Sequence, residues 1–192
     1  MSMTKFAAAA ATTLAALAFS TSAQAVVLLG AEGAHRNTVT DYSSTGVVSF
    51  DLDLRSFTNN TISFVLEEAD LAGPLSFSAM VNNLIGLALP RFNFSLQGIS
   101  YAAPGSVYSF TGHTVSYTSS NAAISFPRGE TAEFQFGNPT DVDGRSDWLL
   151  DTTGLRAGDT FSIVAQVPEP ATAALMLPLV AGLLLARRRK RD

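Results

Sequence analysis

Hydrophobic and polar residues alternate along most of the chain between residues 26 and 166. Residues 48–54 place Val, Phe, Leu and Leu at the even positions, with Ser and Asp between them. A period of two is typical of a strand that buries one face, so this segment is predicted to be a strand. The same alternation, or a short apolar run between turn residues, predicts further strands at 62–66, 75–81, 92–96, 107–110, 115–117, 122–126, 132–136 and 161–165.

Turn-forming residues separate these segments. Gly, Pro, Asn and Asp gather at 59–60, 73–74, 104–105, 127–129, 137–139 and 158–159. Roughly nine or ten short strands with such spacing predict an all-β fold, an antiparallel β-sandwich or jelly-roll-like single domain over residues 26–166. A closed barrel is the alternative, and an outer-membrane barrel is disfavoured because the alternate face carries Asp and Ser. A helical turn is expected only within 81–89.

The first 25 residues have a different composition. A short positive start that ends at Lys5 is followed by an almost wholly apolar or small stretch at 6–19, and Ala23 and Ala25 form an A-x-A site. This layout predicts an N-terminal secretory signal helix, cut by signal peptidase after Ala25. The mature chain is therefore expected to be exported and to begin at Val26.

The last 26 residues contain a Pro-flanked acid, an apolar run and a basic cluster. The apolar run at 171–186 reaches only about 24 Å as a helix, short of the roughly 30 Å hydrocarbon core, and Pro178 interrupts it. Such a marginal helix suits a transient membrane segment, with an ordinary single-pass anchor as the alternative. The cations keep the C-terminus in the cytoplasm. The box is Val167, Pro168, Glu169 and Pro170, and the basic cluster is Arg187, Arg188, Arg189, Lys190 and Arg191.

These three parts, in this order, resemble the PEP-CTERM sorting signal of exopolysaccharide-producing Gram-negative bacteria. The resemblance covers residues 167–192 only. It implies that exosortase, a membrane-embedded cysteine peptidase, processes the tail. It also implies that the chain is membrane-associated before processing and is then delivered to the cell surface or the extracellular matrix.

The charge of the predicted domain is strongly negative. Residues 26–166 hold six Arg, no Lys and fourteen Asp or Glu, a formal charge of −8. Nucleic acid is therefore excluded as an expected partner, because phosphate binding requires clustered positive charge. The chain also has no Cys, so neither disulfides nor thiolate sites are available. The domain must be stabilised by its core, to which eleven Phe can contribute.

One Asp-rich segment is a candidate metal site. Asp141, Asp143 and Asp147 surround Gly144, and several carboxylates from one turn suit a hard cation such as Ca²⁺. The segment lacks the distal Glu of an EF-hand loop, and Arg145 introduces a competing cation. The alternative is a solvated Asp-rich turn before a strand at Trp148.

Aromatic residues suggest a sugar-binding surface, since exposed rings in β-sandwiches stack on sugars. Burial in the core is the alternative for these rings, and the Leu149–Leu150 pair after Trp148 favours it for that residue. The candidates are Tyr42, Tyr101, Tyr108, Tyr117 and Trp148.

No catalytic motif is present in the sequence. His35 and His113 are isolated, and no nucleophile elbow or phosphate loop occurs. A glycoside hydrolase needs only two carboxylates, but no pair stands out among Glu67, Glu68, Glu130 and Glu133.

The sequence thus predicts a non-enzymatic, exported protein with a structural or adhesive role at the cell surface or in the matrix, requiring no cofactor. The alternatives are a carbohydrate-binding module whose partner is exopolysaccharide, a Ca²⁺-stabilised adhesin and, less favoured, a hydrolase.

Overall fold

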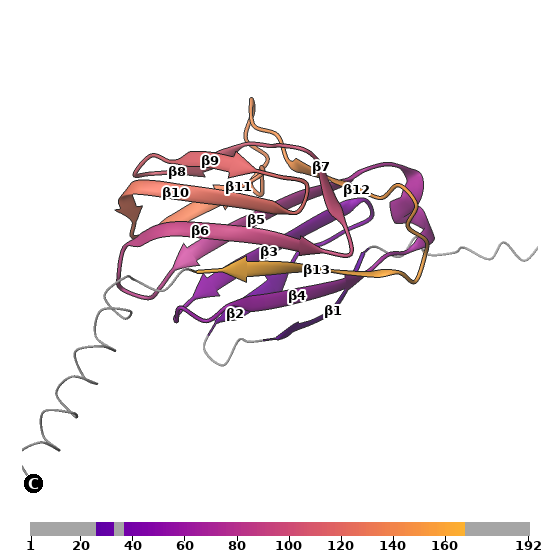
Figure 1. Cartoon of the computed structure of the whole chain (residues 1–192), viewed down its shortest axis with the longest axis horizontal. Helices are drawn as coiled ribbons and strands as arrows, with labels where there is room; N and C mark the ends of the chain where they lie inside the picture. Colours follow the sequence, from indigo (N-terminus) through magenta and orange to yellow (C-terminus); the bar gives the residue numbers. More distant parts are fainter. Residues whose placement is uncertain (1–25, 33–36, 168–192) are drawn as a thin grey trace, which may run out of the picture.

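The computed structural model describes residues 26–32 and 37–167, which form thirteen strands and one 3-10 turn in two packed sheets (Figure 1). The predicted signal helix and the predicted C-terminal helix lie outside the described residues. Within the described ranges, no helix is both long and apolar enough to cross a bilayer. The elements are β1 (Val27–Glu32), β2 (Thr38–Asp41), β3 (Val47–Leu54), β4 (Asn60–Val65), η1 (Glu68–Ala72), β5 (Leu75–Asn83), β6 (Leu89–Gln97), β7 (Ser100–Ala103), β8 (Val107–Ser109), β9 (Thr114–Tyr117), β10 (Asn121–Glu130), β11 (Glu133–Phe136), β12 (Trp148–Asp151) and β13 (Thr160–Gln166).

The two sheets form the predicted β-sandwich. Sheet A has six strands in the order β1-β4-β13-β6-β10-β9, and every neighbouring pair is antiparallel. Sheet B has seven strands, with β2-β3-β5-β11-β8 in sequence and β12 pairing with both β5 and β7. The all-β prediction and the sandwich architecture are confirmed.

One strand pair departs from the antiparallel expectation. β3 and β5 are parallel, from Val47 opposite Ser76 to Leu54 opposite Asn83. The chain leaves sheet B after β3 and forms β4 in sheet A. It then returns to sheet B through η1, so that β5 runs in the same direction as β3. The buried Asp70 of η1 fixes this return, because its carboxylate accepts hydrogen bonds from the Gly46 amide at 2.9 Å and from the Glu67 amide at 2.9 Å.

Aromatic rings fill the space between the sheets. The even positions of β3 are all fully buried, as the alternation predicts. Phe94 lies at the centre, with ring centroids 4.8 Å from Phe136, 5.0 Å from Phe92 and 5.4 Å from Phe77. Trp148 extends the stack, its ring 4.5 Å from Phe136 and nearly parallel to it.

Three strands were not predicted, and the expected helical turn was misplaced. β1 and β2 are largely solvent-accessible, and β7 has only four residues, of which Tyr101 is buried, so their sequences lack a clean apolar period. Residues 81–89 contain the end of β5, a loop and the first residue of β6 rather than a helical turn. The 3-10 turn forms instead at η1.

We expect Phe94→Ala to lower the free energy of unfolding by about 3–5 kcal/mol, because it removes the ring that joins both sheets. Urea unfolding followed by Trp148 fluorescence measures this. Phe110→Ala is the matched control, since its ring is 64% exposed, and should change stability by no more than about 0.5 kcal/mol. Equal losses in both variants would contradict the central role of Phe94.

Candidate functional site

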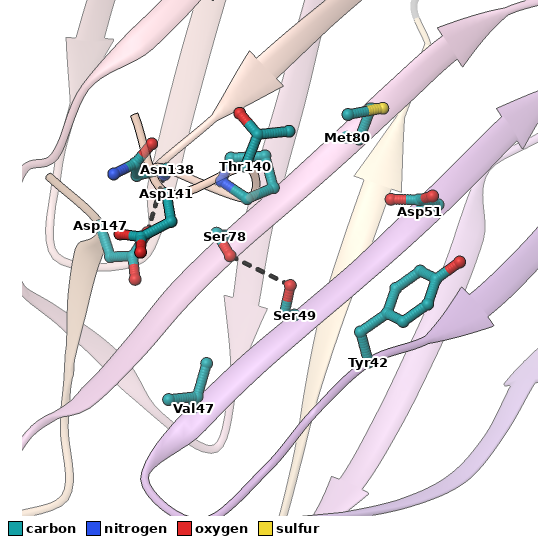
Figure 2. Close-up of a pocket in the computed structure, with 11 residues that line it drawn as sticks. Tyr42, Val47, Ser49, Asp51, Ser78, Met80, Asn138, Thr140, Asp141 and Asp147 are labelled. Carbon is teal, nitrogen blue, oxygen red and sulfur yellow. Dashed lines mark hydrogen bonds between the residues drawn. The ribbon is translucent and has the colours of Figure 1, made fainter. Parts of the chain in front are cut away.

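An open groove of about 490 Å³ lies on the outer face of sheet B (Figure 2). β3 and β5 form its floor. The loop at residues 138–147 forms one wall, and Tyr42, which follows β2, forms the other. The lining side chains are mostly hydroxyls, carboxylates and amides. They are Tyr42, Val47, Ser49, Asp51, Ser78, Met80, Asn138, Pro139, Thr140, Asp141 and Asp147.

The groove floor follows from strand alternation. Because the even positions of β3 point into the core, Ser49 and Asp51 point outward. The parallel register sets Ser49 opposite Ser78 and Asp51 opposite Met80. The Ser78 hydroxyl donates to the Ser49 hydroxyl at 3.1 Å, which fixes two oxygens at the base of the groove (Figure 2).

The Asn138 side chain organises the first wall. Its Oδ1 accepts from the Val142 amide at 2.8 Å, and its Nδ2 donates to the Val142 carbonyl at 3.1 Å. The backbone N–H of Asn138 in turn donates to Asp147 Oδ1 at 2.7 Å. Asp141, between them, adopts a left-handed conformation with φ of 50°, which Asp tolerates better than most residues. The loop is therefore held by its own side chains.

Gly137 fixes this wall against the sheet. It has φ of +74°, and a Cβ there would stand only 2.7 Å from the carbonyl oxygen of Phe77. The Ser106 carbonyl accepts from both the Gly137 amide at 2.8 Å and the Trp148 indole at 3.2 Å. The buried indole thereby connects the core to the loop that forms the groove wall.

Tyr42 forms the opposite wall and is the exposed ring of the groove. Its amide donates to the Ser49 carbonyl at 2.8 Å, which holds the backbone beside β3. The side chain is 59% exposed and stands next to Asp51 in the close-up (Figure 2). A flat ring beside fixed hydroxyl and carboxylate groups can stack on one face of a ligand while those groups bind its edge.

The charge distribution of the groove is acidic. Burial, followed by the nearby charges of Asp53 and Glu133, raises the pKa of Asp51. The cation of the loop is already engaged, because the Arg145 guanidinium lies 4.2 Å from the centroid of the Tyr108 ring and donates to Gln135 Oε1 at 2.6 Å. The groove therefore presents carboxylates while Arg145 is held at its flank.

The structure separates the five aromatic candidates. Trp148 and Tyr101 are 1% and 6% exposed, so they are core residues and the idea that they stack on sugars is wrong. Burial raises the pKa of the Tyr101 hydroxyl. Arg145 covers one face of Tyr108, and Tyr117 packs edge-on against Trp148 at 5.5 Å. Tyr42 is the candidate that lines the groove.

The three aspartates of the candidate Ca²⁺ site do not form a ligand set. Asp141 and Asp147 line the groove, whereas Asp143 is exposed at the turn and does not. Throughout 26–32 and 37–167, no three His, Asp or Glu side chains gather closely enough to hold a metal ion. One reason is that Asp147 turns toward the backbone amide of Asn138.

The candidate acids and histidines are also dispersed. Glu67 and Glu68 lie at η1, near the start of β3, whereas the fully buried Glu130 lies at the opposite end of the sandwich and accepts from Thr111 at 3.0 Å. Burial lowers the pKa of His113, whose Nδ1 lies 3.2 Å from the Ser109 hydroxyl. The remaining candidates are Glu133, which lies beside the groove on β11, and His35, which lies outside the described residues.

Most of the predicted sorting residues lie outside the described part of the chain. Val167 is the exception, since it is 3% exposed and belongs to the core cluster. The other predicted processing residues are Ala23, Ala25, Pro168, Glu169, Pro170, Arg187, Arg188, Arg189, Lys190 and Arg191.

Sequence reasoning named Tyr42, Asp141 and Asp147 and missed the other groove residues, which are Val47, Ser49, Asp51, Ser78, Met80, Asn138, Pro139 and Thr140. The available signal was the polar half of the strand alternation, which identifies outward positions but not which strands are neighbours. Comparison with known proteins returned no matching family model, no matching curated protein and no matching solved structure.

We expect Asp51→Asn to raise the melting temperature at pH 7. A folded-state pKa raised above the unfolded value means that ionised Asp51 costs stability. The free energy of unfolding is therefore not lowered by Asp51 below the unfolded pKa, near 4. The destabilisation develops as pH rises through the folded-state pKa and Asp51 ionises. The advantage of the variant should therefore vanish below about pH 4, where wild-type Asp51 is protonated in both states.

Scanning calorimetry between pH 3 and 8 measures the difference. Asp143→Asn is the matched control, because it removes the same charge from an exposed turn outside the groove. A wild-type protein that is more stable than Asp51→Asn at pH 7 would contradict the argument.

Proposed function

We propose that this chain is an exported, non-catalytic β-sandwich with a structural or adhesive role, which binds polysaccharide in the groove on sheet B. The observation that carries the proposal is the side-chain chemistry of that groove. Exposed Tyr42 stands beside the linked hydroxyls of Ser49 and Ser78 and the carboxylate of Asp51. A sugar ring has the matching properties, an apolar face and an edge of hydroxyl groups.

The hydrogen-bonding groups suit a polyhydroxylated ligand. Each ionised carboxylate offers two acceptor oxygens, and the side chains of Thr140 and Ser49 both donate and accept. The groove is open rather than enclosed, so a chain of sugars can extend beyond it along the outer face of the sheet. This supports a polymer ligand more than a free monosaccharide.

The charge of the groove selects among polysaccharides. Asp51, Asp141 and Asp147 contribute negative charge, and Asp53 and Glu133 stand close to Asp51. Like charges across an interface are unfavourable, so a polymer rich in carboxylate or sulfate groups would be rejected. We therefore propose a neutral or amino-sugar polysaccharide as the ligand.

The resemblance of the tail supplies the destination. Signal peptidase would release the N-terminus after Ala25, and exosortase would act at the box that begins with Val167. The domain would then reach the cell surface or the matrix, where exopolysaccharide is present. The strongly acidic charge of residues 26–166 is consistent with a soluble extracellular domain.

We expect Tyr42→Ala to weaken polysaccharide binding about five- to tenfold, because stacking on an aromatic ring contributes about 1 kcal/mol. Affinity electrophoresis against neutral, amino-sugar and anionic polysaccharides measures the loss. Phe110→Ala is the control, since it removes an exposed ring that does not line the groove. Equal weakening in both variants, or preference for anionic polymers, would contradict the proposed site.

We expect the protein recovered from the host surface to begin at Val26 and to have lost the residues beyond the box. Intact mass spectrometry measures both ends. A variant with Pro168, Glu169 and Pro170 replaced by Ala should keep its tail and stay in the membrane. A wild-type protein that retains Asp192 would instead indicate a permanent anchor.

A further inference from the structure

Three large apolar side chains are exposed at one end of the sandwich. Leu84 and Leu87, in the β5–β6 loop, are 50% and 56% exposed, and Phe110, after β8, is 64% exposed. Together they form a loop platform. Isolated exposed apolar residues are ordinary, but a group at one end of a domain marks an interaction surface.

Buried polar groups hold the loops of the platform together. Asn83 Nδ2 donates to the Leu87 carbonyl and to the Glu130 carbonyl, both at 2.8 Å. The Thr111 hydroxyl, next to Phe110, donates to Glu130 Oε2 at 3.0 Å. Because the loop backbones are fixed in this way, their apolar side chains remain directed away from the core.

Exposed arginines lie at the same end. Arg91 is opposite Ser125 in the β6–β10 pairing, and Arg128 lies in the irregular stretch before Glu130, which pairs with Leu89. Among the described residues, the salt bridge that forms is between Arg55 and Asp53. Arg91 and Arg128 therefore have no carboxylate partner within the described part of the chain, although the domain as a whole is acidic.

The chain leaves the domain at this end. β13 finishes with Gln166 opposite Asn93, near the start of β6, and Val167 is buried in the core (Figure 1). Four residue steps separate Val167 from Ala171, where the apolar run of the tail begins. Even fully extended, they span at most about 14 Å. A tail inserted in a bilayer would thus hold this end of the sandwich close to the lipid surface.

We propose that the loop platform, flanked by Arg91 and Arg128, docks on the surface of an anionic phospholipid bilayer. The inference rests on the proposed insertion of the tail. Leu84, Leu87 and Phe110 would enter the boundary between headgroups and acyl chains, and the arginines would bind lipid phosphates. The acidic 138–147 loop lies toward the start of β5, away from Asn83, and so would face away from the lipid.

The test uses the full chain in vesicles of phosphatidylcholine and phosphatidylglycerol whose acyl chains are brominated near the headgroup. Leu87→Trp and, separately, Phe110→Trp report contact by fluorescence quenching. Val142→Trp, at a 41% exposed position on the acidic loop, is the control. Native Trp148 is 1% exposed and supplies the same background in every variant.

Quenching of most of the added fluorescence of Leu87→Trp and Phe110→Trp, with none for Val142→Trp, is the expected result. Adding Arg91→Glu and Arg128→Glu to Leu87→Trp should reduce the quenching in these anionic vesicles. If the chain floats with the vesicles but the platform probes are not quenched, docking is wrong while tail insertion stands. Coverage of the platform by a second copy of the chain would also leave the probes unquenched and would likewise overturn docking on lipid. If the chain does not float, tail insertion and docking both fail.

Discussion

Packing of aromatic rings between the two sheets is the interaction on which the structure depends. The chain has no Cys, so no disulfide stabilises the domain. Phe94 contacts rings from both sheets, and Phe136 continues the contact to Trp148. Because each strand commits alternate side chains to this core, the remaining side chains are available on the outer faces. The groove on sheet B is built from this second set.

The groove also depends on the core through its loop. Trp148 buries its ring and donates its indole N–H to the Ser106 carbonyl, which also accepts from Gly137. Gly137 then passes close to β5, and Asn138 begins the wall. An Asp-rich turn with no metal ligand set is thereby held in a defined shape by hydrogen bonds. Burial and the neighbouring carboxylates of Asp53 and Glu133 make the charge of Asp51 in the groove unfavourable.

The sequence was sufficient for strands whose two faces differ in polarity, such as residues 48–54. It was insufficient for β1 and β2, whose exposure leaves no clear period, and for the parallel β3–β5 pair, which depends on the path of β4 through the other sheet. The site was harder to predict for the same reason. Tyr42 and Trp148 were both aromatic candidates. The Leu149–Leu150 pair favoured burial of Trp148, but the place of Tyr42 in the groove followed only when the strand neighbours were known.

Val167 belongs to two parts of the protein at once. In the resemblance to a PEP-CTERM signal it opens the proposed sorting box, yet by packing it is a core residue of the sandwich. The first residue of the proposed box therefore belongs to the folded domain. A processing enzyme that approaches the box would meet the folded domain at once. A box transferred to another protein would carry a valine without the core that buries Val167 here.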